Sequence, residues 1–80
     1  MRHELETLYR LRGRQFARLA WAITRDPELA WDALQDGFAR ALLRQDSFRG
    51  HGDLDAWVAR IVANAAQDIV RRRSDELDLH

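Results

Sequence analysis

The sequence contains no cysteine and no lysine, and it has only one proline and four glycines in 80 residues. Without cysteine the chain forms no disulfide and no thiolate metal site, which is typical of proteins in a reducing cytoplasm. No apolar run approaches the roughly 20 residues of a membrane helix, and no apolar segment follows the charged N-terminus as in a signal peptide. We therefore expect a cytoplasmic protein that does not enter a membrane.

Groups suited to catalysis or metal binding are scarce as well. The three histidines, His3, His51 and His80, lie far apart and lack the short spacing of metal ligands. There is no glycine-rich phosphate loop and no nucleophile placed beside a base. We expect no enzymatic activity, no metal and no cofactor.

The composition is that of a globular protein, with 46% hydrophobic and 32% charged residues. The 13 basic and 13 acidic residues cancel, which argues against a general nucleic-acid binder. All 13 basic residues are arginine, a residue that suits forked hydrogen bonds to phosphate or bases. A GC-rich genome would produce the same bias, so this composition alone does not decide the function.

Hydrophobic periodicity predicts three helices, at about residues 5–24, 27–44 and 54–73. Asp26 and Pro27 mark the start of the second helix, because the carboxylate caps free amides and proline is tolerated at the first helical position. Asp53 is the expected N-cap of the third helix, after a loop containing Gly50 and Gly52. Residues 74–80 are interpreted as a frayed tail or as the start of a linker. No stretch alternates like a strand, so we predict a single all-α domain over residues 1–80, a small three-helix bundle.

A polar patch is expected on the outer face of the second helix. Asp32, Gln35 and Asp36 are neighbours there because they are spaced three and four residues apart, and Trp31 flanks them. An acidic and amide patch beside an aromatic side chain suits docking on a basic protein surface. An ordinary solvated helix face, with Asp36 paired to Arg40, explains the spacing equally well.

The third helix carries a second polar stripe. It is formed by Trp57, Arg60, Asn64, Gln67, Asp68 and Arg71. Amide side chains read base edges, arginine contacts phosphate or guanine, and tryptophan stacks on bases. The alternative is a solvated face with a partly buried tryptophan. In the preceding loop, Phe48 and Arg49 beside Gly50 suit the capture of an unstacked base, although Phe48 could equally fill the space under the loop.

Taken in order, these residues resemble region 2 of the extracytoplasmic-function sigma factors. The second subregion of that family has an acid, two residues, glutamine, an acid, one residue and phenylalanine. Asp32, Gln35, Asp36 and Phe38 match this pattern, and residues 48–50 match the family's loop. The third and fourth subregions are matched in order and spacing by Ala56, Trp57, Arg60, Ile61, Asn64, Asp68, Arg71, Arg72 and Arg73. The resemblance covers residues 5–73.

The resemblance implies a domain of a transcription initiation factor with two binding surfaces. Asp32, Gln35 and Asp36 would dock on the clamp helices of the largest RNA polymerase subunit, and Phe38 would be core. The loop would hold a base flipped from the minus-ten promoter element, so that the duplex opens without ATP. The single-stranded non-template DNA would be contacted by Phe48, Arg49, Gly50, Arg60, Asn64, Asp68, Arg71 and Arg72. Trp57 would pack against the loop, and an anti-sigma factor is a possible further partner.

Departures from the family pattern keep a second interpretation open. Trp31 stands where the family usually has an acid. Asp53 and Asp55 make the entrance to the third helix acidic, which would repel phosphates. The family's region 4, a helix-turn-helix that reads the upstream promoter element, is absent from the 80 residues. The alternative function is a sigma-like protein-interaction module, a regulator or decoy that does not melt promoters.

Overall fold

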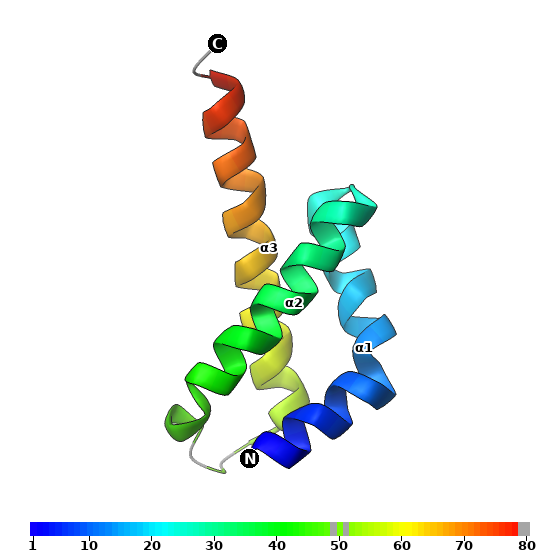
Figure 1. Cartoon of the computed structure of the whole chain (residues 1–80), viewed down its shortest axis with the longest axis vertical. Coiled ribbons are helices and arrows are strands. Elements are labelled where there is room, and N and C mark those ends of the chain that lie inside the picture. The colour runs from blue at the N-terminus through cyan, green and yellow to red at the C-terminus, as the bar shows by residue number, and fades with distance from the viewer. Residues whose placement is uncertain (49, 51, 79–80) are drawn as a thin grey trace.

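The computed structural model describes residues 1–48, 50 and 52–78, which form three α-helices and one short 3-10 helix. Helix α1 spans Arg2–Thr24, α2 spans Pro27–Leu43, and α3 spans Leu54–Asp78, with the 3-10 helix η1 at Gln45–Ser47. Figure 1 shows α1 and α2 joined by a tight turn, and α3 extending beyond both at its C-terminal end. The predicted all-α three-helix bundle is confirmed. None of the described helices is long and apolar enough to cross a membrane.

The starts of α2 and α3 follow from the caps that the sequence predicts. The Asp26 carboxylate accepts hydrogen bonds from the backbone N–H groups of Glu28, at 2.9 Å, and Leu29, at 3.1 Å. The Asp53 carboxylate accepts one from the N–H of Asp55 at 2.9 Å. These bonds satisfy amides that have no partner within the helix, so both predicted caps are confirmed.

The outer ends of the helices differ from the prediction. Helix α1 begins at Arg2 rather than near Leu5, and α3 continues past Arg73 to Asp78. The expected frayed tail is therefore wrong for residues 74–78, and residues 79–80 lie outside the described part of the chain. The physical reason is that residues 74–78 contain neither glycine nor proline, so nothing in them stops the helix.

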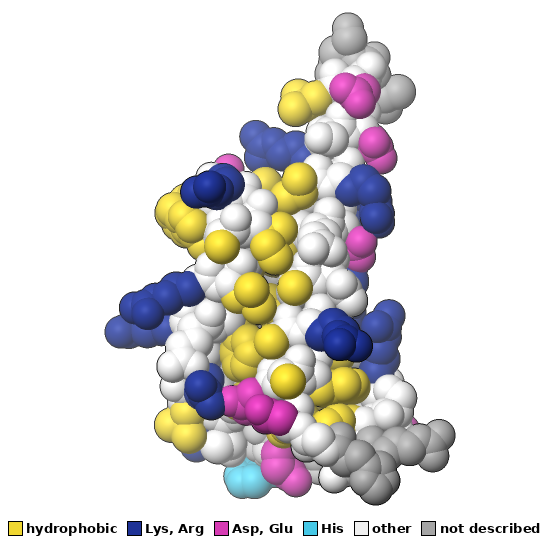
Figure 2. Space-filling model, turned by 180° about the vertical axis from the view of Figure 1, so that it is seen from behind, with side chains coloured by type: hydrophobic (Ala, Val, Ile, Leu, Met, Phe, Trp, Pro, Cys, Tyr) yellow, Lys and Arg dark blue, Asp and Glu magenta, His cyan; other side chains and the backbone are white. Residues whose placement is uncertain are grey.

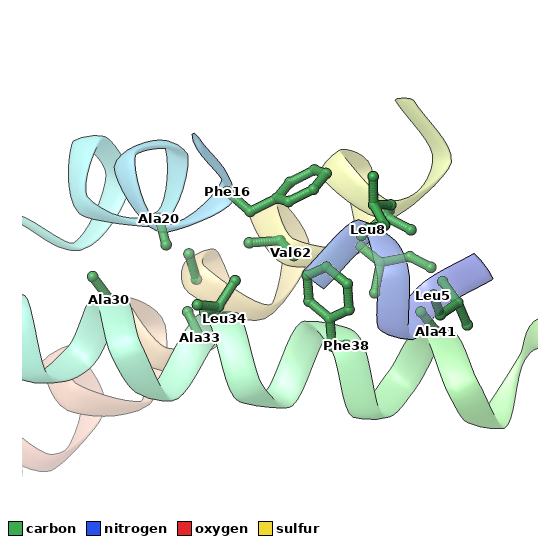
Figure 3. Packing of buried hydrophobic residues seen from close by; sticks show 13 residues of the cluster. Leu5, Leu8, Phe16, Ala20, Ala30, Ala33, Leu34, Phe38, Ala41 and Val62 are labelled. Atoms are coloured by element: carbon green, nitrogen blue, oxygen red, sulfur yellow. The ribbon is translucent and has the colours of Figure 1, made fainter. Parts of the chain in front are cut away.

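One face of each helix contributes to a shared core, seen at close range in Figure 3. Its members are Leu5, Leu8, Phe16, Ala20, Ala30, Ala33, Leu34, Phe38, Ala41, Val58, Ile61, Val62 and Ala66. The expected core position of Phe38 is confirmed, because its ring meets those of Tyr9 and Phe16 edge-on at centroid distances of 5.1 and 5.5 Å. The small residues on α2 allow its neighbours to pack closely.

Gly37 lies where α2 packs tightly against α3. A Cβ atom at this position would be 2.7 Å from Cγ2 and 2.8 Å from Cα of Val62. Since a backbone atom cannot turn aside, any side chain here would push the two helices apart. This close approach explains a glycine inside a helix, where glycine costs about 1 kcal/mol relative to alanine.

Among the described residues, ion pairs connect α3 to both other helices. Arg12, which interrupts the apolar stripe of α1, pairs with Asp55. Arg40 of α2 donates a hydrogen bond to Asp68 at 2.9 Å. That hydrogen bond lowers the pKa of the Asp68 carboxyl against the opposing effect of desolvation, and it raises the pKa of Arg40. The bundle is thus held by polar bridges as well as by its small core.

Gly37→Ala should lower the free energy of unfolding by about 1–3 kcal/mol, because the added methyl group overpacks the contact with Val62. Gly13→Ala is the matched control. A Cβ at Gly13 would meet no described atom within 4 Å beyond its own stretch of helix, so the better helix propensity of alanine should stabilise that variant by up to about 1 kcal/mol. Urea unfolding measures both changes. Similar stabilisation by both alanines would contradict the close approach of α2 and α3.

Asp68→Asn should lower the thermal unfolding midpoint at neutral pH, because it removes the charge that Arg40 binds. A carboxyl whose pKa is lower in the folded state stabilises the fold above its unfolded pKa of about 4, and this stabilisation disappears as the pH falls through the folded-state pKa. The difference from wild type should therefore shrink in acid. Exposed Asp75 pairs with no described residue, so Asp75→Asn is the control. A difference independent of pH would contradict a charge effect.

Candidate binding surfaces

The expected patch on α2 is present, but its three side chains differ in whether they are hydrogen-bonded within the fold. The Gln35 amide donates a hydrogen bond to the Tyr9 hydroxyl at 2.6 Å. Asp36 accepts one from Arg40 at 3.0 Å, the pairing expected of a solvated helix face. Asp32 is exposed and makes no hydrogen bond or ion pair with a described residue. The patch therefore offers one free carboxylate beside two side chains whose positions are already fixed.

Apolar surface surrounds this patch. The Trp31 side chain, one residue before Asp32, is 56% exposed. An open hollow of about 340 Å³ between α1 and α2 is lined by Leu5, Glu6, Tyr9, Gln35, Phe38, Ala39 and Leu42. Because Gln35 belongs to both features, the hollow and the patch form one continuous surface. That surface can take an apolar side chain of a partner beside a basic one.

Several of the expected α3 residues lie free on the surface. Arg60, Asn64 and Arg72 are exposed, and none of their side chains is hydrogen-bonded or ion-paired to a described residue. Two cations and an amide at these positions can contact phosphate oxygens and base edges. The described part of the chain thus supplies the donors that nucleic-acid binding requires.

Asp68, in contrast, is already engaged. Its carboxylate accepts hydrogen bonds from Arg40 at 2.9 Å and from Arg71 at 2.8 Å. Because Arg40 also binds Asp36, a continuous chain of charges runs Asp36–Arg40–Asp68–Arg71 from the α2 patch to the α3 face. Sequence reasoning found the local pair but missed the second partner of Arg40. That partner is 28 residues away, and such a distance leaves no signal in the spacing.

The loop before α3 is supported from below by an aromatic pair. The rings of Phe48 and Trp57 lie 5.3 Å apart at 48°, and both side chains are partly buried. The expected contact between Trp57 and the loop is confirmed. Gly50 is exposed with a φ of +73°, a conformation that favours glycine. Arg49, the remaining residue expected in the loop, lies outside the described residues.

The acidic entrance to α3 is less repulsive than its sequence suggests. Asp53 is used as the N-cap, where its carboxylate binds a backbone amide. Asp55 pairs with Arg12 of α1, which neutralises its charge. Both carboxylates therefore have partners within the fold, and their effect on an approaching phosphate is reduced.

A sequence profile of sigma-70 region 2 matches residues 8–76. The ECF RNA polymerase sigma factor SigM of Mycobacterium tuberculosis (strain H37Rv) is 41% identical over 71 residues, which cover 89% of this chain and 36% of that protein. The ECF RNA polymerase sigma factor SigM of Bacillus subtilis (strain 168) is 28% identical over 75 residues, covering 94% and 45%. The chain spans less than half the length of these relatives. No solved structure matches it significantly.

The α2 patch and the α3 face both fall within the matched segment. The profile begins before Tyr9, the residue that binds Gln35 of the α2 patch. It ends after Arg72, the last expected residue of the α3 face. The profile, the curated relatives and the all-helical fold agree with the family resemblance that the sequence motifs indicate. The chain therefore belongs to the sigma-70 region 2 family, in the form found in ECF RNA polymerase sigma factors.

Proposed function

We propose that this domain links RNA polymerase to promoter DNA at the start of transcription, as a non-catalytic initiation factor in the cytoplasm. One observation carries the proposal: a single family match over residues 8–76 includes both the α2 patch and the α3 face. Support comes from the relatives, which are named as RNA polymerase sigma factors. The two surfaces divide the work between protein docking and DNA binding.

The α2 patch is the proposed docking site for the clamp helices of the largest polymerase subunit. Asp32 supplies the free carboxylate for a basic group on the partner. Gln35 and Asp36 are held by Tyr9 and Arg40. Side chains that are ordered before binding lose less entropy on association, so their contacts contribute more of their energy to affinity. An apolar side chain of the partner that fills the hollow beside them would exclude water from the same interface.

The loop and the α3 face are the proposed site for the non-template strand of the minus-ten element. Asn64 would read a base edge, while the phosphates would be bound by Arg49, Arg60, Arg71 and Arg72. Flipping a base costs a few kcal/mol, and stacking returns roughly 1–3 kcal/mol per base, so strand capture needs no ATP. Phe48 and Gly50 would form the pocket wall, which Trp57 supports.

Asp68 has a different role in this proposal from direct contact with the strand. Both of its oxygens are occupied by guanidinium groups, and a carboxylate facing DNA would repel phosphates. We assign it instead to orienting Arg71, with Arg40 as its anchor on α2. The phosphate-binding arginine is then positioned by the same residue that holds Asp36 in the docking patch.

A second candidate function is a sigma-like interaction module that binds polymerase or an anti-sigma factor without melting DNA. The observation that favours it is the 56% exposure of Trp31, at a position where the resembling family usually has an acid. An exposed tryptophan is a common anchor of protein interfaces. In that case the α2 surface would bind its partner and the α3 face would remain unused.

Asp32→Arg should weaken binding to the isolated clamp-helix fragment of the polymerase at least about tenfold, since it places like charges against each other. Asp32 is exposed and unpaired among the described residues, so the fold should persist. Asp75→Arg makes the same charge change on exposed α3 surface and should leave binding intact. Titration calorimetry measures the affinities, and circular dichroism checks helicity. Unchanged binding by Asp32→Arg would place the docking site elsewhere.

Asn64→Ala should reduce affinity for a minus-ten single strand, in the complex with polymerase, by about 1–3 kcal/mol. Gln67→Ala removes the other exposed amide of the same polar stripe, a residue that the family resemblance does not assign to the strand, and should have little effect. Fluorescence anisotropy of a labelled strand measures both. If Asn64→Ala binds and opens promoters like wild type, the base-reading role is wrong and the interaction module becomes the better assignment.

A further inference from the structure

The outer face of α1 carries a stripe of residues that belongs to neither surface described above. Arg10, Arg14, Arg18, Trp21 and Arg25 follow one another at spacings of four, four, three and four residues. This spacing places the four helical members on one face, and Arg25 caps the helix at the end of the same line. Each of these side chains is exposed, whereas the opposite face of α1 is buried in the core.

The stripe concentrates positive charge that the zero net charge of the chain conceals. No aspartate or glutamate occurs from residue 7 to residue 25. None of the four arginines pairs with a carboxylate in the described ranges, although Arg12, which is also exposed, pairs with Asp55 of α3. Figure 2 shows arginine side chains projecting from the edge of the molecule that α1 forms. This face is free to meet an anionic partner.

The arrangement works against the stability of α1 itself. Arginines one turn apart repel each other along an isolated helix. Arg25 adopts a left-handed conformation with a φ of 57°, at a helix end where glycine is usual because it has no Cβ to crowd the backbone. The described contacts give the Arg25 side chain no structural role that offsets this strain. A binding role accounts for charges that the fold does not use.

We infer that the outer face of α1 binds single-stranded DNA. The guanidinium groups of Arg10, Arg14 and Arg18 suit phosphate oxygens, and the stripe to Arg25 extends about 22 Å at 1.5 Å per residue, enough for several nucleotides. Trp21, 49% exposed, lies between Arg18 and Arg25. Its ring can stack on the face of an unpaired base. In duplex DNA that face is covered by the neighbouring base pairs. The choice of DNA over RNA rests on the proposed function.

The test uses the 80-residue chain alone, with a labelled single strand of mixed sequence followed by fluorescence anisotropy at several salt concentrations. The double variant Arg14→Gln/Arg18→Gln should bind more weakly, with a slope of log K against log salt that is shallower by about 1.4, or 0.7 per lost phosphate contact. The control Arg2→Gln/Arg44→Gln removes the same net charge from other exposed positions and should keep the slope. Equal losses in both variants would overturn the proposal.

Two single substitutions distinguish binding by the stripe from a general effect of charge and from an effect on folding. Trp21→Ala should weaken binding to the single strand, while Trp31→Ala removes a tryptophan of similar exposure and should not. Arg25→Gly should raise the thermal midpoint by relieving the left-handed arginine, yet lower DNA affinity, an opposition that a purely structural role would not produce. Unchanged affinity in Trp21→Ala and Arg25→Gly would overturn the proposal.

The nucleic acid itself is varied as the last arm of the experiment. Tighter binding to a duplex or to a single RNA strand of the same sequence than to single-stranded DNA would also overturn the assignment. Clamp-helix binding is measured separately, with the variants of the α2 patch. If the α1 variants do not change DNA binding but the clamp helices are bound as expected, the proposed function stands and the α1 inference is wrong. If the α1 variants weaken DNA binding but the clamp helices are not bound, the α1 inference stands and the proposed function is wrong.

Discussion

The close approach of α2 to α3 at Gly37 is the constraint on which both candidate surfaces depend. With no side chain at Gly37, the backbone of Val62 comes within the space that a Cβ would occupy. At this separation the Arg40 guanidinium spans the two helices and binds Asp36 and Asp68 together. A wider gap would strain the bridge that connects the α2 patch to the α3 face.

The distribution of charge matters more in this molecule than its sum. Acids with partners on other helices, such as Asp55 and Asp68, are neutralised within the fold, whereas Asp32 stays free on α2. The arginines of the α1 stripe stay free on a different face. A chain with zero net charge can therefore present an acidic patch on α2 and a basic stripe on α1 at once, because internal pairing neutralises charges elsewhere on the surface.

Most of the fold could be predicted because its signals are local. The cap at Asp26, the apolar faces and the core position of Phe38 all depend on spacings within a few turns of helix, which the sequence displays directly. The long-range bridges of Arg12 and Arg40 could not be predicted, since many carboxylates were available to each. For the same reason, the free Asp32 and the occupied Asp68 looked alike in the sequence, although the fold gives them opposite electrostatic roles.

The bridge through Arg40 has a consequence for how a small domain could open DNA. Because its core is modest, such a domain has a small free energy of unfolding, and little of it can offset the entropy lost in ordering surface side chains. Here Asp36, Arg40, Asp68 and Arg71 are already linked by hydrogen bonds in the unbound chain. Binding energy at α2 would then be available to present α3 to the strand, instead of being consumed in arranging side chains. Polar contacts between the helices thus position these surface side chains, a task that a larger hydrophobic core performs in a larger protein.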